Sequence, residues 1–167
     1  MKQPVLILLK PDCLAKTILG SVINRLQETQ LDIIAMRLVK VSREIAENHY
    51  QHHKSKPFFE DMIKYILGQY HNKRPLLAIV LFGENSIKKC RDLAGATNPE
   101  ESSPMSIRGS FGRITTNGIF ENVIHVSESY RESKREIKLW LGPGDLISDT
   151  FPTKKIIITN FSTRVWA

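Results

Sequence analysis

Four apolar segments of strand length are spaced along the chain, and segments with helical periodicity lie between them. The strand-length segments cover 5–9, 31–41, 76–82 and 122–127. The first and third are apolar at almost every position, which is typical of strands buried inside a sheet. The second carries Ile34, Met36 and Leu38 in period-two alternation, which also predicts a strand. Strands separated by helices restrict the chain to folds that mix α and β structure.

The helices are marked by apolar spacing and by residues that favour helix ends. Leu19, Ile23 and Leu26 recur at helical spacing, and Ser42 is placed to cap the helix that follows the second strand. Gly95 is the residue type that commonly ends a helix. We expect helices over 18–26, from Ser42 onward, over 57–66, from Asn85 or Ser86 to Gly95, and from Ser129, which has capping-box spacing to Glu132, as far as 142–144.

This order of elements matches the split βαβ pattern of a ferredoxin-like sandwich. The fold is α+β with order βαββαβ, and its antiparallel four-stranded sheet is expected to carry helices on one face. The chain has 167 residues, close to the prior of roughly 150 for one domain, so we expect a single domain over 1–167. The last segment, 154–159, is expected either to add an edge strand or to pack on a partner subunit.

Charge and cysteine content narrow the partners and the compartment. The formal net charge is +7, which favours an anionic partner without choosing among nucleic acid, an anionic membrane surface and a phosphate-rich small molecule. No apolar run approaches the roughly 18 residues of a membrane-spanning helix, which rules out membrane insertion. We expect no membrane partner. Cys13 and Cys90 match no metal-binding spacing and form no disulfide framework, which favours a reducing compartment.

The segment 96–121 has no strong periodicity and is rich in Gly, Thr, Ser and Asn. Loops this long in a compact domain are usually functional or disordered. This one carries Arg108 and Arg113, so we place the functional site there. Lys10, Arg91 and Arg108 all lie at element ends or in loops, where three cations could together hold a polyphosphate.

His125 lies in the last strand between apolar neighbours, where a histidine is usually structural. Asn122 precedes it at the end of the long loop, and Glu136 follows on the next helix. If that helix returns beside the strand, Glu136 can orient the imidazole as in nucleophilic sites. A surface pair with a neighbouring helical residue explains Glu136 equally well at this point.

Three further patterns match known functional motifs only in part. His49 and His53 are one helical turn apart, but the glutamate of an HExxH metal site is missing, so an exposed helix face is the better interpretation. The segment 142–145 lacks the Lys-Ser/Thr of a P-loop. The segment 108–112 has only part of the basic and aromatic pattern of RNA-recognition sheets.

Several short motifs, in the correct order over 5–145, resemble the nucleoside diphosphate kinase family. The segment Leu-Lys-Pro-Asp at 9–12 is similar to that family's opening strand and turn. Tyr50 and Lys-Pro-Phe-Phe at 56–59 resemble its base clamp. Other segments resemble the phosphate-binding and active-site motifs of that family. They are Arg91, Gly-Ala-Thr-Asn-Pro at 95–99, Ser-Ile-Arg-Gly at 106–109, Asn-Val-Ile-His at 122–125, Ser-Glu-Ser at 127–129 and Glu-Ile at 136–137.

The resemblance implies transfer of the γ-phosphate of a nucleoside triphosphate to a nucleoside diphosphate through a phosphohistidine at His125. Glu136 would orient the imidazole, and Lys10 would act with both as a catalytic residue. It also implies Mg²⁺ carried by the nucleotide phosphates rather than by a protein site, broad base use, a homo-oligomer (tetramer or hexamer) and a cytoplasmic location. The nucleotide-binding residues would be Lys10, Tyr50, Phe58, Met62, Arg91, Thr97, Arg108 and Asn122, with Phe58 and Met62 on either side of the base.

The chain departs from the family pattern in places. The segments 67–75 and 112–121 are longer than typical, and the tail 148–167 is atypical. Cys13 and Val126 stand where glycine is usual, and Glu128 stands where aspartate is common. Two other functions stay open: a basic module on the same fold that binds nucleic acid without kinase activity, and a metal-dependent hydrolase that uses His49 and His53. Nucleic acid is otherwise expected only as a secondary partner.

Overall fold

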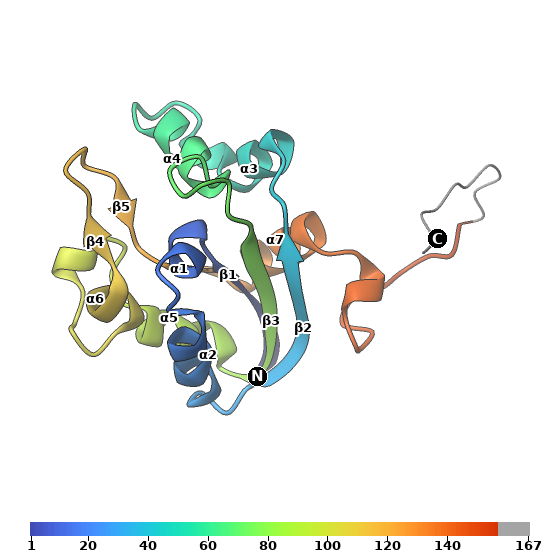
Figure 1. Cartoon of the computed structure of the whole chain (residues 1–167). Coiled ribbons are helices and arrows are strands. Elements are labelled where there is room, and N and C mark those ends of the chain that lie inside the picture. The colour runs from blue at the N-terminus through green and yellow to red at the C-terminus, as the bar shows by residue number, and fades with distance from the viewer. Residues whose placement is uncertain (157–167) are drawn as a thin grey trace, which may run out of the picture.

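The computed structural model describes residues 1–156 (Figure 1). The segment expected as an edge strand, 154–159, runs into 157–167, which lie outside the described residues. The strands are β1 (Lys2–Leu9), β2 (Asp32–Val39), β3 (Leu76–Glu84), β4 (Arg113–Ile114), β5 (Phe120–Glu121) and β6 (Ile124–Val126). The helices are α1 (Pro11–Ala15), α2 (Leu19–Gln27), α3 (Arg43–His49), α4 (Phe59–Ile66), α5 (Ser86–Ala94), α6 (Ile107–Phe111) and α7 (Tyr130–Trp140), with 3₁₀ turns η1 (Gln51–His53), η2 (Pro99–Glu101) and η3 (Pro143–Asp145).

The main sheet has the strand order β2-β3-β1-β6, and each neighbouring pair is antiparallel. Leu6 of β1 lies opposite Val80 of β3, and Leu8 of β1 lies opposite His125 of β6. With helices between the strands, this order is that of a ferredoxin-like α+β sandwich, which confirms the predicted fold class.

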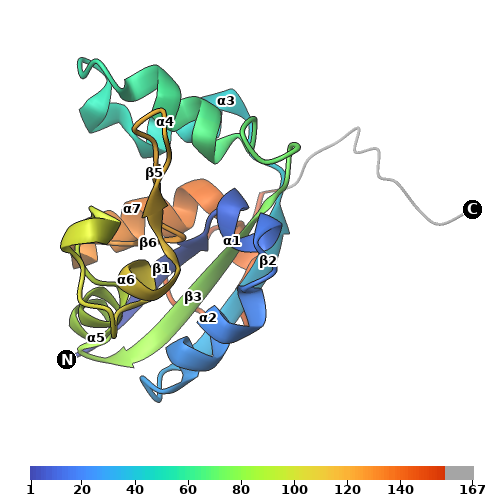
Figure 2. The same ribbon diagram turned by 60° about the vertical axis from the view of Figure 1, so that its left-hand side comes forward.

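Helices cover both faces of the sheet, so the expectation of a single covered face is wrong. Val5, Ile7 and Leu9 of β1 pack against residues of α2, α5 and α6. Leu6 and Leu8 of the same strand pack against residues of α3, α4 and α7 on the opposite face. Successive side chains of a strand point to opposite faces, and all five of these are 0% exposed, so both faces have to be covered. Figure 2 shows α2 and α7 on opposite sides of the sheet.

The helix ends follow the expected capping residues in most cases. The Ser42 hydroxyl accepts a hydrogen bond from the Ile45 N–H, and the Ser129 hydroxyl accepts one from the Glu132 N–H. α5 ends before Gly95, whose φ of 84° is in the left-handed region that glycine adopts without strain. A Cβ atom at this position would lie only 2.1 Å from Ser102 Oγ, so the close packing of the following loop also requires glycine.

The segment 96–121, expected to be one irregular loop, contains η2, α6 and the β4–β5 hairpin. Each of these elements is five residues or shorter, which is too short to produce a recognisable period. The segment 112–121, which is longer than the family pattern, contains the whole β4–β5 hairpin, whereas 67–75 is a series of turns between α4 and β3. Among the described residues, no helix is long and apolar enough to cross a membrane.

Candidate active site

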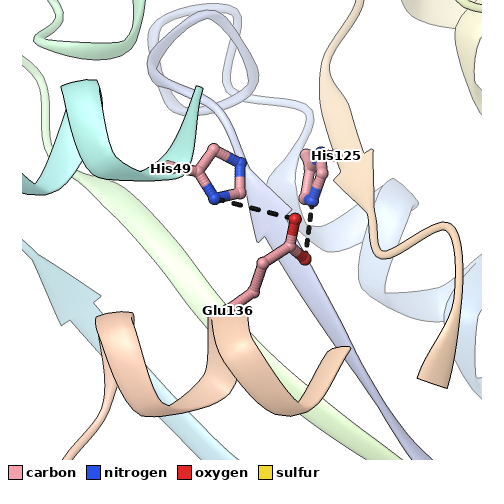
Figure 3. A group of neighbouring side chains, drawn as sticks. All are labelled: His49, His125 and Glu136. Carbon is pink, nitrogen blue, oxygen red and sulfur yellow. Dashed lines mark hydrogen bonds and ion pairs between the residues drawn. The ribbon is translucent and has the colours of Figure 1, made fainter. Parts of the chain in front are cut away.

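His125 and Glu136 meet at the face of the sheet that α7 covers (Figure 3). β6 places the imidazole, and the second turn of α7 returns the carboxylate to it, with Nε2 of His125 3.0 Å from Oε2 of Glu136. Glu136 is buried, so the alternative of a surface pair on α7 is wrong. The His125 side chain keeps 20% of its surface exposed, which leaves it accessible to a ligand.

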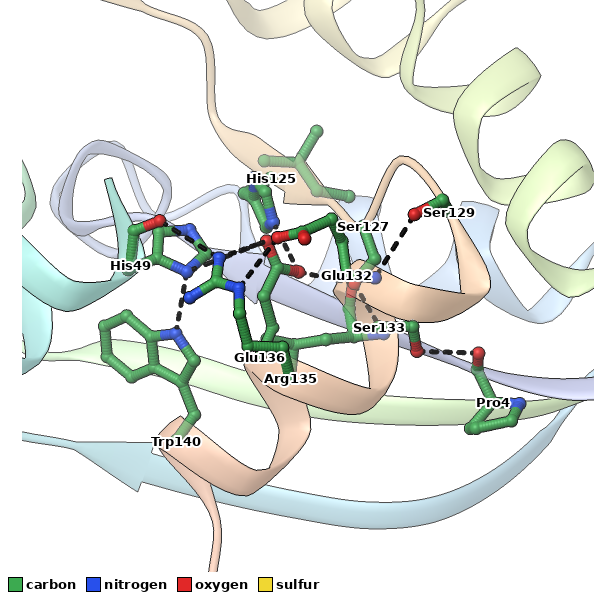
Figure 4. Close-up of polar contacts among 12 residues, drawn as sticks. Pro4, His49, His125, Ser127, Ser129, Glu132, Ser133, Arg135, Glu136 and Trp140 are labelled. Atoms are coloured by element: carbon green, nitrogen blue, oxygen red, sulfur yellow. Dashed lines mark hydrogen bonds and ion pairs between the residues drawn. The ribbon is translucent and has the colours of Figure 1, made fainter. Parts of the chain in front are cut away.

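Glu136 fixes which nitrogen of His125 carries the proton. Its Oε2 also accepts a hydrogen bond from the Ser127 hydroxyl at 2.5 Å (Figure 4). Burial acts to raise the pKa of Glu136, but the hydrogen bonds from His125 and Ser127 and the charge of Arg135 outweigh burial and lower it. The ionised carboxylate can only accept, so Nε2 of His125 is protonated and Nδ1 presents its lone pair.

His49 lies directly beside His125, although the sequence predicted an exposed helix face for it. It is 1% exposed, and its ring centroid is 4.5 Å from that of His125 in an edge-on arrangement. Its Nδ1 accepts a hydrogen bond from the indole N–H of Trp140 at 3.1 Å (Figure 4). Burial, reinforced by the nearby His125, keeps the pKa of His49 well below its usual value, so the ring is neutral. The available signal was its spacing from the buried Ala46, which places both residues on one face of α3.

Lys10 and Asn122 form a buried polar pair next to this cluster. Nζ of Lys10 donates to Oδ1 of Asn122 at 2.6 Å, and Nδ2 of Asn122 donates to the Thr97 carbonyl at 2.9 Å. Burial, helped by the charge of Arg108, lowers the pKa of Lys10 to about 7, while Asp12 acts in the opposite direction. These predicted nucleotide-binding residues therefore come together from the end of β1 and from two separate loops.

Arg108 braces the loop around the site and keeps part of its guanidinium available. Nη1 donates to the Gly95 carbonyl at 2.8 Å, and Nη2 and Nε donate to the Ile124 carbonyl at 2.9 and 3.3 Å. A guanidinium has five N–H donors, so two remain for a ligand. Burial and the nearby Arg91 lower the pKa of Arg108 to about 10, so it stays positively charged at neutral pH.

The other predicted site residues lie around this centre at different distances. Tyr50 is buried, and its ring centroid is 4.5 Å from that of His49. His49 in turn lies against His125. Arg91 is exposed on α5. Phe58 is 52% exposed just before α4, whereas Met62 on α4 packs partly against the apolar core. No contact among the described residues joins Phe58 or Met62 to His125, so their role in base binding stays a prediction.

One group of potential metal ligands occurs among the described residues. His49, His125 and Glu136 each offer an atom, and these atoms lie within 4.8 Å of one another. The His49 nitrogen that faces Glu136 already accepts the Trp140 N–H, and the His125 nitrogen is bound to the same carboxylate. His53 does not belong to this group, so among the described residues nothing joins His49 and His53 in a set of three ligands.

An oriented imidazole with a free nitrogen, next to buried cations, suits an enzyme that transfers phosphoryl groups through a histidine. The comparisons with known proteins agree with this class. A family model described as nucleoside diphosphate kinase matches residues 3–146, and the chain belongs to that family.

Individual relatives extend over most of the chain. The nucleoside diphosphate kinase of Pyrococcus furiosus is 38% identical over 144 residues, which cover 86% of each chain. That of Archaeoglobus fulgidus is 39% identical over 142 residues, covering 85% of this chain and 88% of the relative. The Halobacterium salinarum enzyme, solved in complex with CDP, has a TM-score of 0.79 at 27% identity and covers 89% of this chain and 93% of its own. The Borrelia burgdorferi enzyme, solved as a transition-state mimic with vanadate and ADP, has a TM-score of 0.77 at 28% identity, covering 88% and 91%.

Proposed function

We propose that the chain is a nucleoside diphosphate kinase that moves the γ-phosphate of a nucleoside triphosphate to a nucleoside diphosphate. The observation that carries this proposal is the contact of His125 Nε2 with Glu136, which leaves Nδ1 as the free nucleophile. Family membership and the transition-state mimic of a relative support the same reaction. A module that only binds nucleic acid has no use for a buried carboxylate that orients an imidazole.

The reaction has two half-steps with one covalent intermediate. The lone pair of His125 Nδ1 attacks the γ-phosphorus, an N–P bond forms, and the O–P bond to the β-phosphate breaks with its electron pair leaving on the diphosphate. The first diphosphate then leaves and a second enters the same site. Its terminal oxygen attacks the phosphohistidine and restores the imidazole, while Glu136 holds the Nε2 proton throughout. Ping-pong kinetics follow.

The cations and polar groups around His125 hold the triphosphate for this transfer. Phosphoryl transfer depends mainly on positioning and on stabilising negative charge, which Lys10, Arg108 and Arg91 supply. Asn122 and its partner Lys10 both reach the ribose hydroxyls. Tyr50 and Thr97 add hydroxyl groups to the phosphate site. Phe58 stacks on the base with Met62 behind it. Stacking reads only the face of a base, so the enzyme uses all common bases.

Mg²⁺ enters as part of the substrate, bound to the nucleotide phosphates. Mg²⁺ prefers oxygen ligands and keeps several waters, and it is commonly held by one or two carboxylates together with substrate phosphates. Among the described residues, the carboxylate in contact with His125 is that of Glu136, and its Oε2 is already engaged by both His125 and Ser127. The residues at the site therefore fit a metal carried by the nucleotide rather than one held in a protein cage.

Incubation with γ-labelled ATP and Mg²⁺, without an acceptor, tests this function directly. We expect one acid-labile, base-stable phosphate per active site, and its transfer to any added nucleoside diphosphate. The chain would instead be the nucleic-acid module if it stayed unlabelled and bound RNA with an affinity that falls steeply with salt.

Lys10→Met is expected to raise thermal stability while it reduces phosphotransfer. The pKa of Lys10 is about 7 in the folded protein and about 10.5 in the unfolded chain, so the unfolded chain binds more protons between these values. The cost of burying the Lys10 ammonium therefore falls as pH rises from about 7 to about 10.5, and it is largest below about pH 7. Removing the buried charge should raise the melting temperature most at about pH 6. Each kcal/mol corresponds to roughly 2–4 °C in a chain of this size.

The control for this variant is Lys88→Met, which removes an exposed ammonium on α5. We expect its melting temperature to follow the pH dependence of the wild type. A lower melting temperature of Lys10→Met at about pH 6 would show that the Lys10 charge is well compensated in the free enzyme.

The chain assembles as a homo-oligomer, a tetramer or hexamer, in the cytoplasm. β2 is an edge strand, and its Ile33, Met36 and Leu38 are exposed, with Leu38 at 60%. Beside them lies an apolar cavity of about 170 Å³ between α2 and the sheet. Exposed apolar patches of this kind commonly mark interfaces. Cys13 and Cys90 are buried free thiols, which suits a reducing compartment.

Met36→Glu should lower the mass that light scattering measures in solution to that of a smaller assembly, because it places a charge in the apolar surface of β2. The matched control is Met105→Glu, which changes an exposed methionine outside β2 and should leave the mass unchanged. An unchanged mass for Met36→Glu would mean that β2 is not the interface.

A further inference from the structure

The carboxylate of Glu121, the last residue of β5, contacts three basic side chains from three parts of the chain. Its Oε1 lies 2.9 Å from Nε2 of His71, in the turns that follow α4. Its Oε2 lies 2.9 Å from Nζ of Lys16, at the end of α1, and accepts the Nε–H of Arg113 on β4 at 2.6 Å. The contact with His71 joins the two segments that are longer than the family pattern, 67–75 and 112–121.

This contact is buried, and its carboxylate is ionised. The side chains of His71 and Glu121 are only 8% and 6% exposed. Burial acts to raise the pKa of Glu121, but the hydrogen bonds from Arg113, Lys16 and His71 outweigh burial and lower it to about 2. A buried carboxylate with several donors holds a more definite position than an exposed ion pair. We name this contact, His71 with Glu121, the clasp.

The residues that directly follow the clasp lead to the proposed phosphate site. Asn122 binds Lys10 through its side chain. Val123 has a φ of 66°, which is a strained value for a β-branched residue. Backbone strain of this kind persists only when the surroundings hold it. Here the Lys10 N–H donates to the Val123 carbonyl at 2.8 Å, and the Val123 N–H donates to Oδ2 of Asp12 at 3.1 Å.

The segment from Glu121 to Val123 is therefore held at each residue in turn. The clasp fixes its first residue, Lys10 and Thr97 fix Asn122, and Asp12 fixes Val123. The next two residues are Ile124, whose carbonyl accepts from Arg108, and His125 itself. A displacement of Glu121 would therefore reach Asn122, the partner of Lys10, one residue away, and His125 four residues away.

We propose that His71 and Glu121 are positioning residues for phosphotransfer, which hold Asn122 and thereby Lys10 in place beside His125. The inference rests on the proposed kinase function. In this arrangement the longer segments 67–75 and 112–121 share one role, because each supplies one residue of the clasp. The β4–β5 hairpin brings the carboxylate to the end of β5, and the turns at 67–75 bring the imidazole against it.

Two single variants and their combination test the clasp. Glu121→Gln keeps the size of the side chain and removes its charge, and we expect kcat/KM to fall about a hundredfold, the usual effect of a misplacement of about 1 Å. His71→Gln keeps a donor near the position of Nε2, and we expect a loss of about tenfold. The double variant should be no slower than Glu121→Gln alone, because both changes break the same contact.

The matched control is Glu60→Gln, which removes a carboxylate that pairs with Arg43 on the surface and should retain the wild-type kcat/KM. Melting temperature is measured for every variant, and the rate of phosphohistidine formation is measured per labelled site at saturating ATP. A positioning role predicts a slower rate per labelled site. The proposal is overturned if the variants only melt earlier while that rate and KM keep their wild-type values, or if the two losses multiply in the double variant.

The outcome is separable from that of the kinase proposal. If the wild type incorporates phosphate and both clasp variants match it, the clasp fails and the kinase function stands. If the wild type incorporates none, the kinase function fails, and the positioning role fails with it.

Discussion

His125→Ala is expected to take up no phosphate from labelled ATP and to lose phosphotransfer by roughly a millionfold, the size of loss typical when a covalent nucleophile is removed. The physical reason is specific to one atom. Glu136 holds the proton on Nε2, so Nδ1 is the nitrogen that can form the N–P bond. No other described side chain presents a nucleophile in the same place, since the neighbouring His49 uses its Nδ1 to accept from Trp140.

Acid-labile phosphate on the protein and coupled turnover of a diphosphate are the two measurements for this variant. His52→Ala serves as the control, because His52 is an exposed histidine of η1 and should keep both activities. Labelled phosphate that survives in His125→Ala would show that another residue is the nucleophile.

Arg108→Ala is expected to slow phosphoryl transfer by roughly 10³–10⁵, the range found when an arginine that stabilises the transferring phosphate is lost. In the proposed reaction, its two remaining N–H donors would meet the negative charge that grows during transfer, and burial would strengthen this interaction. The variant should also lose stability, because the Gly95 and Ile124 carbonyls lose their donors.

Arg108→Lys separates these two effects in pre-steady-state measurements. Lysine keeps the charge but lacks the forked guanidinium, which binds two carbonyls and in the proposed reaction also a phosphate. We therefore expect an intermediate rate and a similar loss of melting temperature. Near-normal turnover in Arg108→Ala, with a lowered melting temperature, would assign Arg108 a purely structural role.

The fold could be predicted because its strands differ clearly from its helices in sequence. The nearly continuous apolar residues of 5–9 and 76–82 became the two central strands. The prediction of a single covered face was wrong because it followed from the order of the elements alone and not from the residues of β1. A strand that is apolar at successive positions needs cover on both faces, and this was visible in the sequence.

The sequence predicted which residues belong to the site, but it did not predict which of them contact one another. Short motifs indicated His125, Glu136, Lys10 and Asn122, and the structure brings them together from distant parts of the chain. His49 was missed because a histidine in a His-rich segment looks solvent-exposed when its helix has no assigned partner. Glu121 gave no signal at all, because its three partners, Lys16, His71 and Arg113, are brought to it only by tertiary folding.

The strand that carries the proposed nucleophile is only three residues long, and it pairs with a strand far from it in the sequence, with Ile7 lying opposite Val126. Pairings between such distant residues close large loops and tend to form late. A nascent chain thus exposes Lys10 to the cell long before His125 leaves the ribosome. If His125 is the nucleophile, as proposed, a chain that has not yet paired β6 with β1 cannot form the phosphohistidine.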